Sequence, residues 1–260
     1  MDDASHECRR VTGHTVGFIC NEDHSVFAEV ADRLREAGAT VRFFEPGRQL
    51  GDAELGGLSL LLNKKVDPAS FAALARADEH GVTTWNGLHT LQLGFRLVGY
   101  RMLELIGCRV PRVFLEPPEF DYVAKTFVDW HFQPDPVLNG TGDLYQELVP
   151  TTGIDHKHYA VDTGDDIAVR VLKTTSKLRG EKRPLERTDP DPELAAAVRR
   201  LLETTNSQGI GVDFVESDGT FWAVDVNPAM SFRHAGMEGE LADSVCSLLA
   251  TVEEDARVPT

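Results

Sequence analysis

The sequence predicts an α/β (α+β) protein, with a small parallel sheet followed by a larger region of short strands. Two observations support this prediction. Over residues 15–85, short apolar runs alternate with segments of helical pattern, as in β-α-β units. After residue 107, helices become fewer and short strands follow one another. The chain has 260 residues, of which 42% are hydrophobic, so it is long and apolar enough to bury a core.

The first region contains four apolar runs that suit the strands of a parallel sheet. Two helices are expected between them, each with recognisable ends. Ser25 can cap the first helix, and Gly38 ends it. Asp67 can cap the second helix, with Pro68 at its first position. The expected strands are residues 15–20, 40–44, 58–62 and 82–85, and the expected helices are residues 25–37 and 68–81.

A long helix over residues 88–106, ended by Gly107, is expected between the two regions. The later region holds six expected strands, two helices and one basic segment. The strands are residues 122–127, 144–149, 158–161, 167–172, 211–215 and 221–226; the helices are residues 191–205 and 241–250; the basic segment is residues 173–187. We expect three domains from this order, at residues 11–86, 87–146 and 147–254.

The net charge of −16 limits the partners that the surface can bind. It disfavours nucleic acid and anionic membranes, and the apolar run at residues 58–62 is far too short to cross a bilayer. The acidic N-terminus has no signal-peptide pattern, which favours a cytoplasmic protein. An acidic, lysine-poor composition also resembles that of proteins from salt-loving microbes. Homo-oligomer formation and a protein substrate both stay open.

Acidic and amide side chains gather in two neighbouring strands near the C-terminus. If residues 218–220 form a three-residue loop, the strands pair so that Asp213 lies opposite Asp225. Asn227 then shares a face with Asp225, because side chains alternate along a strand. Val212, Phe214, Val224 and Val226 are expected on the opposite, core-facing side.

Two carboxylates held this close repel each other unless a cation lies between them. Mg²⁺ binds one or two protein carboxylates, keeps some of its water and accepts phosphate oxygens. The residue types Asp213, Asp225 and Asn227 therefore suit a magnesium site. The competing interpretation is a hairpin whose polar face is simply solvated.

The sequence GVDF, followed by VDVNP, resembles the metal-binding hairpin of ATP-grasp enzymes. The likeness is to RimK-like and glutathione-synthetase-like ligases, and also to the inositol polyphosphate kinases of the same fold. It implies an ATP-grasp fold, with Mg²⁺ or Mn²⁺ bound by Asp213, Asp225 and Asn227. The family usually has Glu where this chain has Asp225, and the shorter acid keeps the charge.

The same resemblance implies an ATP site, because further segments follow in the family's order. Arg96 stands where the family has a phosphate-binding lysine, Asp155 would reach the ribose, and residues 146–149 would hold the adenine. The implied ATP-binding residues are Arg96, Lys125, Gln146, Glu147, Leu148, Val149, Asp155 and Lys157. Taken alone, Arg96 equally suits the surface of a helix, Lys125 an edge strand and Lys157 a cross-strand ion pair.

The basic segment 173–187 suggests a site for a small anionic substrate, a carboxylate or a phosphate. Lys173 is expected beside the reacting group, and Arg233 would complete the site. The implied reaction is carboxylate–amine ligation through an acyl phosphate, with release of ADP and phosphate. A small-molecule kinase is the first alternative. A non-catalytic nucleotide-binding protein is the second, because Arg96 replaces a lysine and the loop 126–142 has few glycines.

Overall fold

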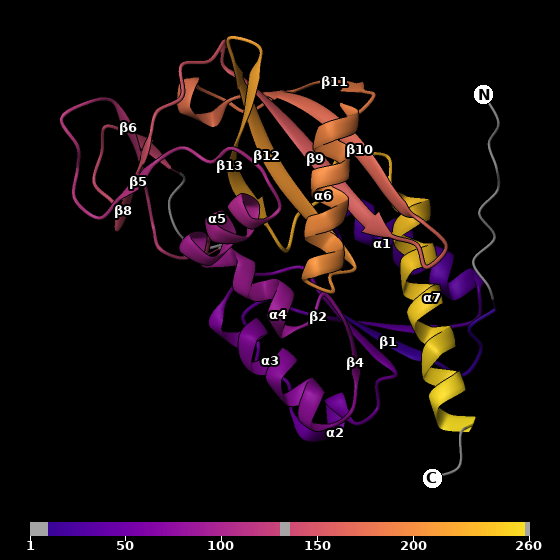
Figure 1. Cartoon of the computed structure of the whole chain (residues 1–260). Coiled ribbons are helices and arrows are strands. Elements are labelled where there is room, and N and C mark those ends of the chain that lie inside the picture. The colour runs from indigo at the N-terminus through magenta and orange to yellow at the C-terminus, as the bar shows by residue number, and fades with distance from the viewer. Residues whose placement is uncertain (1–9, 131–135, 258–260) are drawn as a thin grey trace.

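The computed structural model describes residues 10–130 and 136–257 and contains three sheets (Figure 1). The first sheet is parallel, in the order β2-β1-β3-β4, as the sequence predicted. Asp67 caps its second long helix, accepting a hydrogen bond from Ser70 N at 2.7 Å. The elements are β1 (Thr15–Ile19), α1 (Ser25–Glu36), β2 (Thr40–Phe44), α2 (Asp52–Leu55), β3 (Leu60–Asn63), α3 (Pro68–Glu79) and β4 (Thr83–Trp85).

The long helix expected over residues 88–106 is interrupted, so that prediction is wrong. Phe95 is extended and bridges Val128, and the backbone N–H of Arg96 donates to Phe127 O at 2.8 Å. Contact with this strand-like segment replaces helical hydrogen bonds and starts a new helix at Arg96. The pieces are α4 (Leu88–Leu91), η1 (Gln92–Gly94) and α5 (Arg96–Leu105).

The second sheet is small and antiparallel, in the order β5-β8-β6-β7. Its outer strands are only two residues long, which explains why the sequence pattern did not reveal them. Its elements are β5 (Val113–Phe114), β6 (Tyr122–Lys125), β7 (Val137–Leu138) and β8 (Leu144–Glu147).

The third sheet is antiparallel, in the order β11-β10-β9-β12-β13, and α6 packs across β9, β10 and β12 (Figure 1). The basic segment contributes an edge strand, β11, which the sequence did not indicate. The elements are β9 (Ile154–Asp162), β10 (Ile167–Thr175), η2 (Lys177–Arg179), β11 (Pro184–Thr188), α6 (Pro192–Thr204), β12 (Gly209–Ser217), β13 (Thr220–Asn227) and α7 (Glu238–Arg257).

In the hairpin β12–β13, Asp213 lies opposite Asp225 as predicted, but the pairing arises from a two-residue turn and a bulge and not from the expected three-residue loop. Its turn has two central residues, Asp218 and Gly219, both with positive φ (47° and 71°), as a type I′ turn requires. A bulge then adds one residue, Val224, between the partners of Phe214 and Asp213. Turn and bulge together restore the predicted pairing.

The bulge also corrects the predicted core face of this hairpin. Val212, Phe214 and Val226 are buried, as expected. Val224 is the exception: it is only half-buried and lines a cavity, while Ala223 takes the core position.

Asn86 joins the first sheet to the third. Its Nδ2 donates to Gly209 O (2.5 Å) and Pro228 O (2.9 Å), and its Oδ1 accepts from the backbone N–H of Gln208 and Gly209, each at 3.0 Å. Asn86 has φ 58°, a left-handed conformation that asparagine tolerates. One hydrophobic core runs through both sheets. In the described part of the chain, no helix is long and apolar enough to cross a membrane.

Candidate active site

A cavity of about 390 Å³ is lined by residues of the second and third sheets. Of the thirteen site residues expected from the sequence, eleven line it. They are Arg96, Lys125, Gln146, Glu147, Leu148, Val149, Asp155, Lys157, Asp213, Asp225 and Asn227. Residues distant in sequence therefore meet at one place, within reach of a single ligand.

Arg96 and Asp225 form the best-defined contact in the cavity. Nη1 of Arg96 lies 2.7 Å from both carboxylate oxygens of Asp225, and Nη2 lies 2.7 Å from Asp129 Oδ1. The side chain of Arg96 is 4% exposed. Burial alone would lower the pKa of Arg96, but the carboxylates outweigh it and raise that pKa. Arg96 is thus a buried counter-ion of Asp225, and Asp129 is a site residue that the sequence did not indicate.

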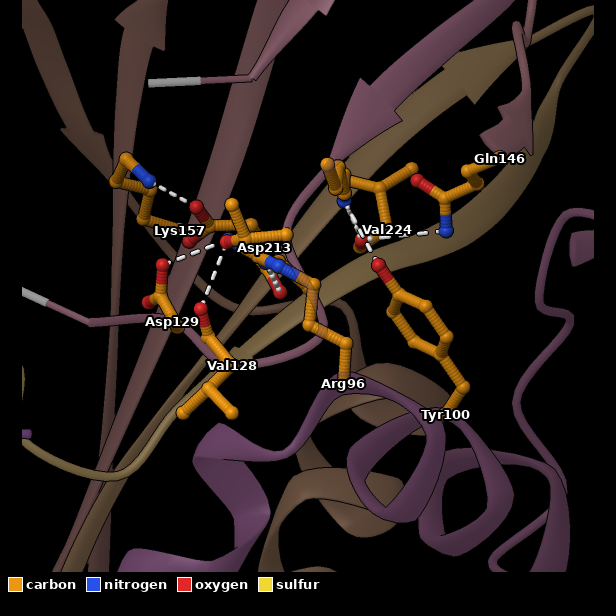
Figure 2. A network of polar contacts seen from close by, with 11 residues as sticks. Arg96, Tyr100, Val128, Asp129, Gln146, Lys157, Asp213 and Val224 are labelled. Atoms are coloured by element: carbon orange, nitrogen blue, oxygen red, sulfur yellow. Dashed lines mark hydrogen bonds and ion pairs between the residues drawn. The ribbon is translucent and has the colours of Figure 1, made fainter. Parts of the chain in front are cut away.

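Lys125 donates to the carbonyl of Val224, the residue that the bulge adds; Figure 2 shows Val224 between Tyr100 and Gln146 on one side and the ion-pair residues on the other. Its Nζ donates to Val224 O at 2.7 Å and to Tyr100 Oη at 2.9 Å, and Gln146 Nε2 donates to the same carbonyl at 3.3 Å. Burial lowers the pKa of Lys125 to about 8, although the nearby Asp225 opposes the shift. This ammonium has neutral partners and can accept a negative ligand.

Lys157 and Asp213 form an ion pair across β9 and β12. Burial would lower the pKa of Lys157, but Asp213 raises it above its ordinary value. Asp155 lies two residues before Lys157 and on the same face of β9. Burial, followed by the charge of Asp213, raises the pKa of Asp155. Lys182 lies nearby, and burial lowers its pKa to about 8.

Residues 146–149, which were expected to hold adenine, already form some of their hydrogen bonds and one ion pair within the protein. The backbone N–H of Leu148 donates to Asp121 O at 3.1 Å, and the Glu147 carboxylate pairs with Arg112 at 2.8 and 3.0 Å. Among the described residues, the N–H of Val149 has no acceptor. The Val149 N–H is therefore the donor open to a ligand at this end of the cavity.

Two expected site residues lie outside the cavity lining. Leu172 pairs with Lys157, so the neighbouring Lys173 points to the other face of the sheet, where its Nζ binds Glu186 at 2.9 Å. Arg233 is exposed in the loop after β13. Three other members of the basic segment do line the cavity: Lys177, Arg179 and Lys182.

No family model matches the sequence, and no curated protein is similar to it. Solved structures, in contrast, match nearly the whole chain. The ATP-grasp ligase PsnB, complexed with a phosphomimetic variant of minimal precursor, Mg and ADP, aligns with a TM-score of 0.64 and 16% identity. The alignment covers 93% of this chain and 99% of PsnB. This chain has the ATP-grasp fold.

Two other ATP-grasp proteins are similar to the same extent. The RimK domain protein of Sphaerobacter thermophilus aligns with a TM-score of 0.67 and 16% identity, over 91% of this chain and 99% of its own. A RiPP-associated ATP-grasp ligase of Chryseobacterium gregarium, in complex with ADP and a leader and core peptide, has a TM-score of 0.61 and 13% identity. That alignment covers 92% of this chain and 97% of the ligase.

The lining charges of the ATP-grasp cavity are nearly balanced, although the chain carries −16. Five carboxylates face six cations. The carboxylates are Asp129, Glu147, Asp155, Asp213 and Asp225, and the cations are Arg96, Lys125, Lys157, Lys177, Arg179 and Lys182. The cavity is therefore far less repulsive to a polyphosphate than the rest of the surface.

The hairpin offers hard oxygen ligands, which suit Mg²⁺, but they are not equally open. Asp213 uses one oxygen for Lys157, and Asn227 Oδ1 accepts from Ala229 N at 3.0 Å and keeps a second lone pair. Asp225 has both oxygens on Arg96. Within the described residues, no group of three His, Cys, Asp or Glu side chains could hold a metal by itself. Two carboxylates and one amide oxygen are the type of donor that Mg²⁺ takes from a protein while it keeps waters or phosphate oxygens.

Proposed function

We propose that this protein is an ATP-dependent carboxylate–amine ligase. One observation carries the proposal. In the cavity between the second and third sheets, buried lysines face a hairpin of paired carboxylates. Phosphoryl transfer needs mainly positioning and positive charge, and this lining supplies both.

In the proposed reaction, a substrate carboxylate oxygen attacks the γ-phosphorus of ATP, and the bond to the β–γ bridging oxygen breaks to release ADP. An amine then attacks the acyl phosphate, loses a proton and expels phosphate, leaving an amide. Lys125 and Lys157 would neutralise charge on the phosphates, Val149 would bind the adenine edge and Asp155 the ribose. Lys173, on the far face of β10, has no contact in this scheme.

Asp213, Asn227 and Asp225 would hold Mg²⁺, which supplies charge neutralisation on the phosphates when bound. Asp225 can join only if one of its oxygens leaves Arg96, whose guanidinium could then turn to phosphate. The proposed acid is a small anionic molecule or an acidic peptide side chain. The peptide option is supported by the complexes of PsnB with a variant of its minimal precursor and of the Chryseobacterium gregarium ligase with a leader and core peptide.

Phosphorus NMR of Mg-ATP with the protein, in high potassium chloride, tests the proposal. Pools of carboxylic acids, acidic peptides and amines are added separately and together. We expect ADP and free phosphate to form only when an acid and an amine are both present. A new phosphoester signal with polyols alone would show a kinase instead. Bound ATP without any turnover would indicate a nucleotide-binding protein.

A further inference from the structure

A second cationic cluster lies at the carboxyl edge of the first sheet, outside the nucleotide cavity. In the order β2-β1-β3-β4, the chain leaves β1 towards β2 on one side and leaves β3 towards β4 on the other side. Between two such strands the connections diverge and leave a crevice at the carboxyl edge, the usual ligand position in open α/β sheets. Lys64 N donates to Ile19 O at 3.2 Å, so the loops after β1 and β3 start side by side.

Lys64 is 5% exposed, and its ammonium, which keeps a small contact with solvent, has no hydrogen-bond acceptor or carboxylate partner among the residues that the structure describes. The other two buried lysines are both satisfied, Lys125 by Val224 O and Tyr100 Oη and Lys157 by Asp213. A buried ammonium without a partner is costly to the fold. Its presence in a chain of 42 acidic residues calls for a ligand that supplies the missing anion.

The charged neighbours of Lys64 increase this cost. Burial, followed by the positive charge of Lys65, lowers the pKa of Lys64 to about 8, and Arg233 lowers it further. Of the groups in the described part of the chain, the thiol of Cys20 opposes the shift. Burial, Lys64 and Arg233 likewise lower the pKa of His24 to about 4, so this histidine is neutral at pH 7.

Packing contacts place Arg233 at this edge. The ring of Phe232 is fully buried and lies 6.4 Å from that of Phe27, which lies 5.2 Å from the ring of His24. His24 caps α1, so the positive end of that helix opens at the same place. Phe232 and His234 both have positive φ (52° and 64°), so the backbone on each side of Arg233 turns sharply.

The cluster lies next to the Asn227 end of the nucleotide cavity. Val66 lies two residues after Lys64, and both Val66 and Pro228 lie close to Gly94. A Cβ built on Gly94 would be 3.1 Å from Val66 Cγ1 and 3.7 Å from Pro228 Cγ. Pro228 directly follows Asn227, a cavity-lining residue. An open hollow of about 550 Å³ lies at the same edge of the sheet; Lys65 lines it, and Lys64 and Arg233 do not.

We propose that Lys64 and Arg233, with the start of α1, bind an anionic group of the acceptor substrate, a carboxylate or a phosphate. This proposal rests on the proposed function, because the site adjoins the cavity end where the phosphates would meet the acid. A substrate held there has at least one anionic group besides the one that reacts. Lys64 is the anchor that the sequence did not indicate.

The test is a calorimetric titration of the full chain, saturated with Mg-ADP, at pH 7 and constant ionic strength. Glutarate and inorganic phosphate are the probes, and they distinguish a carboxylate site from a phosphate site. We expect binding of at least one probe, weakened tenfold or more by Lys64→Met and several-fold by Arg233→Gln. Lys173→Met, which changes the net charge equally, should leave the titration unchanged.

The melting temperature of the ligand-free variants is the second readout. Lys64→Met should raise it, because the variant removes a buried charge without a partner. The proposal is overturned if neither probe binds the parent protein, if Lys64→Met binds as well as the parent, or if that variant melts at a lower temperature. None of these readouts needs turnover, so a failed search for ligase activity leaves them decisive.

Discussion

At the scale of single residues, Arg96 and Asp225 depend on each other. Nη1 of Arg96 contacts both carboxylate oxygens of Asp225, and the Arg96 side chain is 4% exposed. From the sequence, Asp225 looks like an outward acid whose loss costs little stability; the buried ion pair changes that expectation. Removing one partner leaves the other charged and poorly solvated, which costs roughly 3 to 5 kcal/mol.

We therefore expect Asp225→Ala and Arg96→Met each to lower the free energy of unfolding by several kcal/mol, measured by urea denaturation. Arg96→Met should cost more, because it leaves Asp225 and Asp129 together without their shared cation. Glu186→Ala is the matched control: its carboxylate is 60% exposed in its pair with Lys173, so the loss should stay within about 1 kcal/mol. Equal losses in all three variants would contradict the buried ion pair.

Lys64 gives a pH dependence whose sign can be worked out. The folded chain releases this proton at a pKa of about 8, whereas the unfolded chain keeps it up to the ordinary value of 10.5. Between these values the unfolded state binds more protons, so the free energy of unfolding rises with pH. The stability gained by Lys64→Met should therefore be largest below pH 8 and disappear towards pH 10.5. Urea denaturation of both proteins from pH 7 to pH 10 measures this, and a gain independent of pH would refute the charge argument.

At the scale of elements, the bulge in β13 has two effects. It sets Asp225 opposite Asp213 although the turn has only two central residues, and it frees the carbonyl of Val224 for Lys125 and Gln146. An experiment can separate the pairing of Asp213 with Asp225 from the carbonyl acceptor that Val224 offers to Lys125. Deleting Val224 makes the ladder regular while keeping Asp213 opposite Asp225.

We expect the Val224 deletion to stay folded but to bind ADP at least tenfold more weakly, because the ammonium of Lys125 loses a carbonyl acceptor and its position. A buried donor left unsatisfied costs about 1 to 3 kcal/mol of stability. Thermal melts and an ADP titration measure both effects. Gly219→Ala serves as the control: it strains the turn at φ 71° without touching Lys125, so it should change stability and leave ADP affinity unchanged. Unchanged ADP affinity in the deletion variant would rule out this role for the bulge.

The sequence predicts most elements of this chain because their signals are local. Apolar runs and caps such as Asp67 locate the parallel sheet, and the residues of the GVDF and VDVNP strands locate the hairpin. The break at Phe95 and the two-residue strands β5 and β7 depend on contacts with distant backbone, which no local pattern contains.

At the scale of the whole molecule, the same limit applies to the candidate site. Eleven of the residues that line the cavity could be expected one by one, from the segments that carry them. Their partners could not be predicted. Only the packing of the three sheets shows that Arg96 binds Asp225, that Asp129 joins them, and that Lys64 has no anionic partner within residues 10–130 and 136–257.

Asn86 has a consequence for how the molecule can move. Its four hydrogen bonds join the first sheet to the two ends of the β12–β13 hairpin, and Trp85 Nε1 donates to Ser244 Oγ of α7 at 2.9 Å. The small sheet β5–β8 contacts the third sheet at the cavity through Lys125 and Gln146, which both donate to Val224 O. If the cavity binds nucleotide as proposed, we expect it to open by a movement of this small sheet relative to the first and third sheets, which Asn86 holds together.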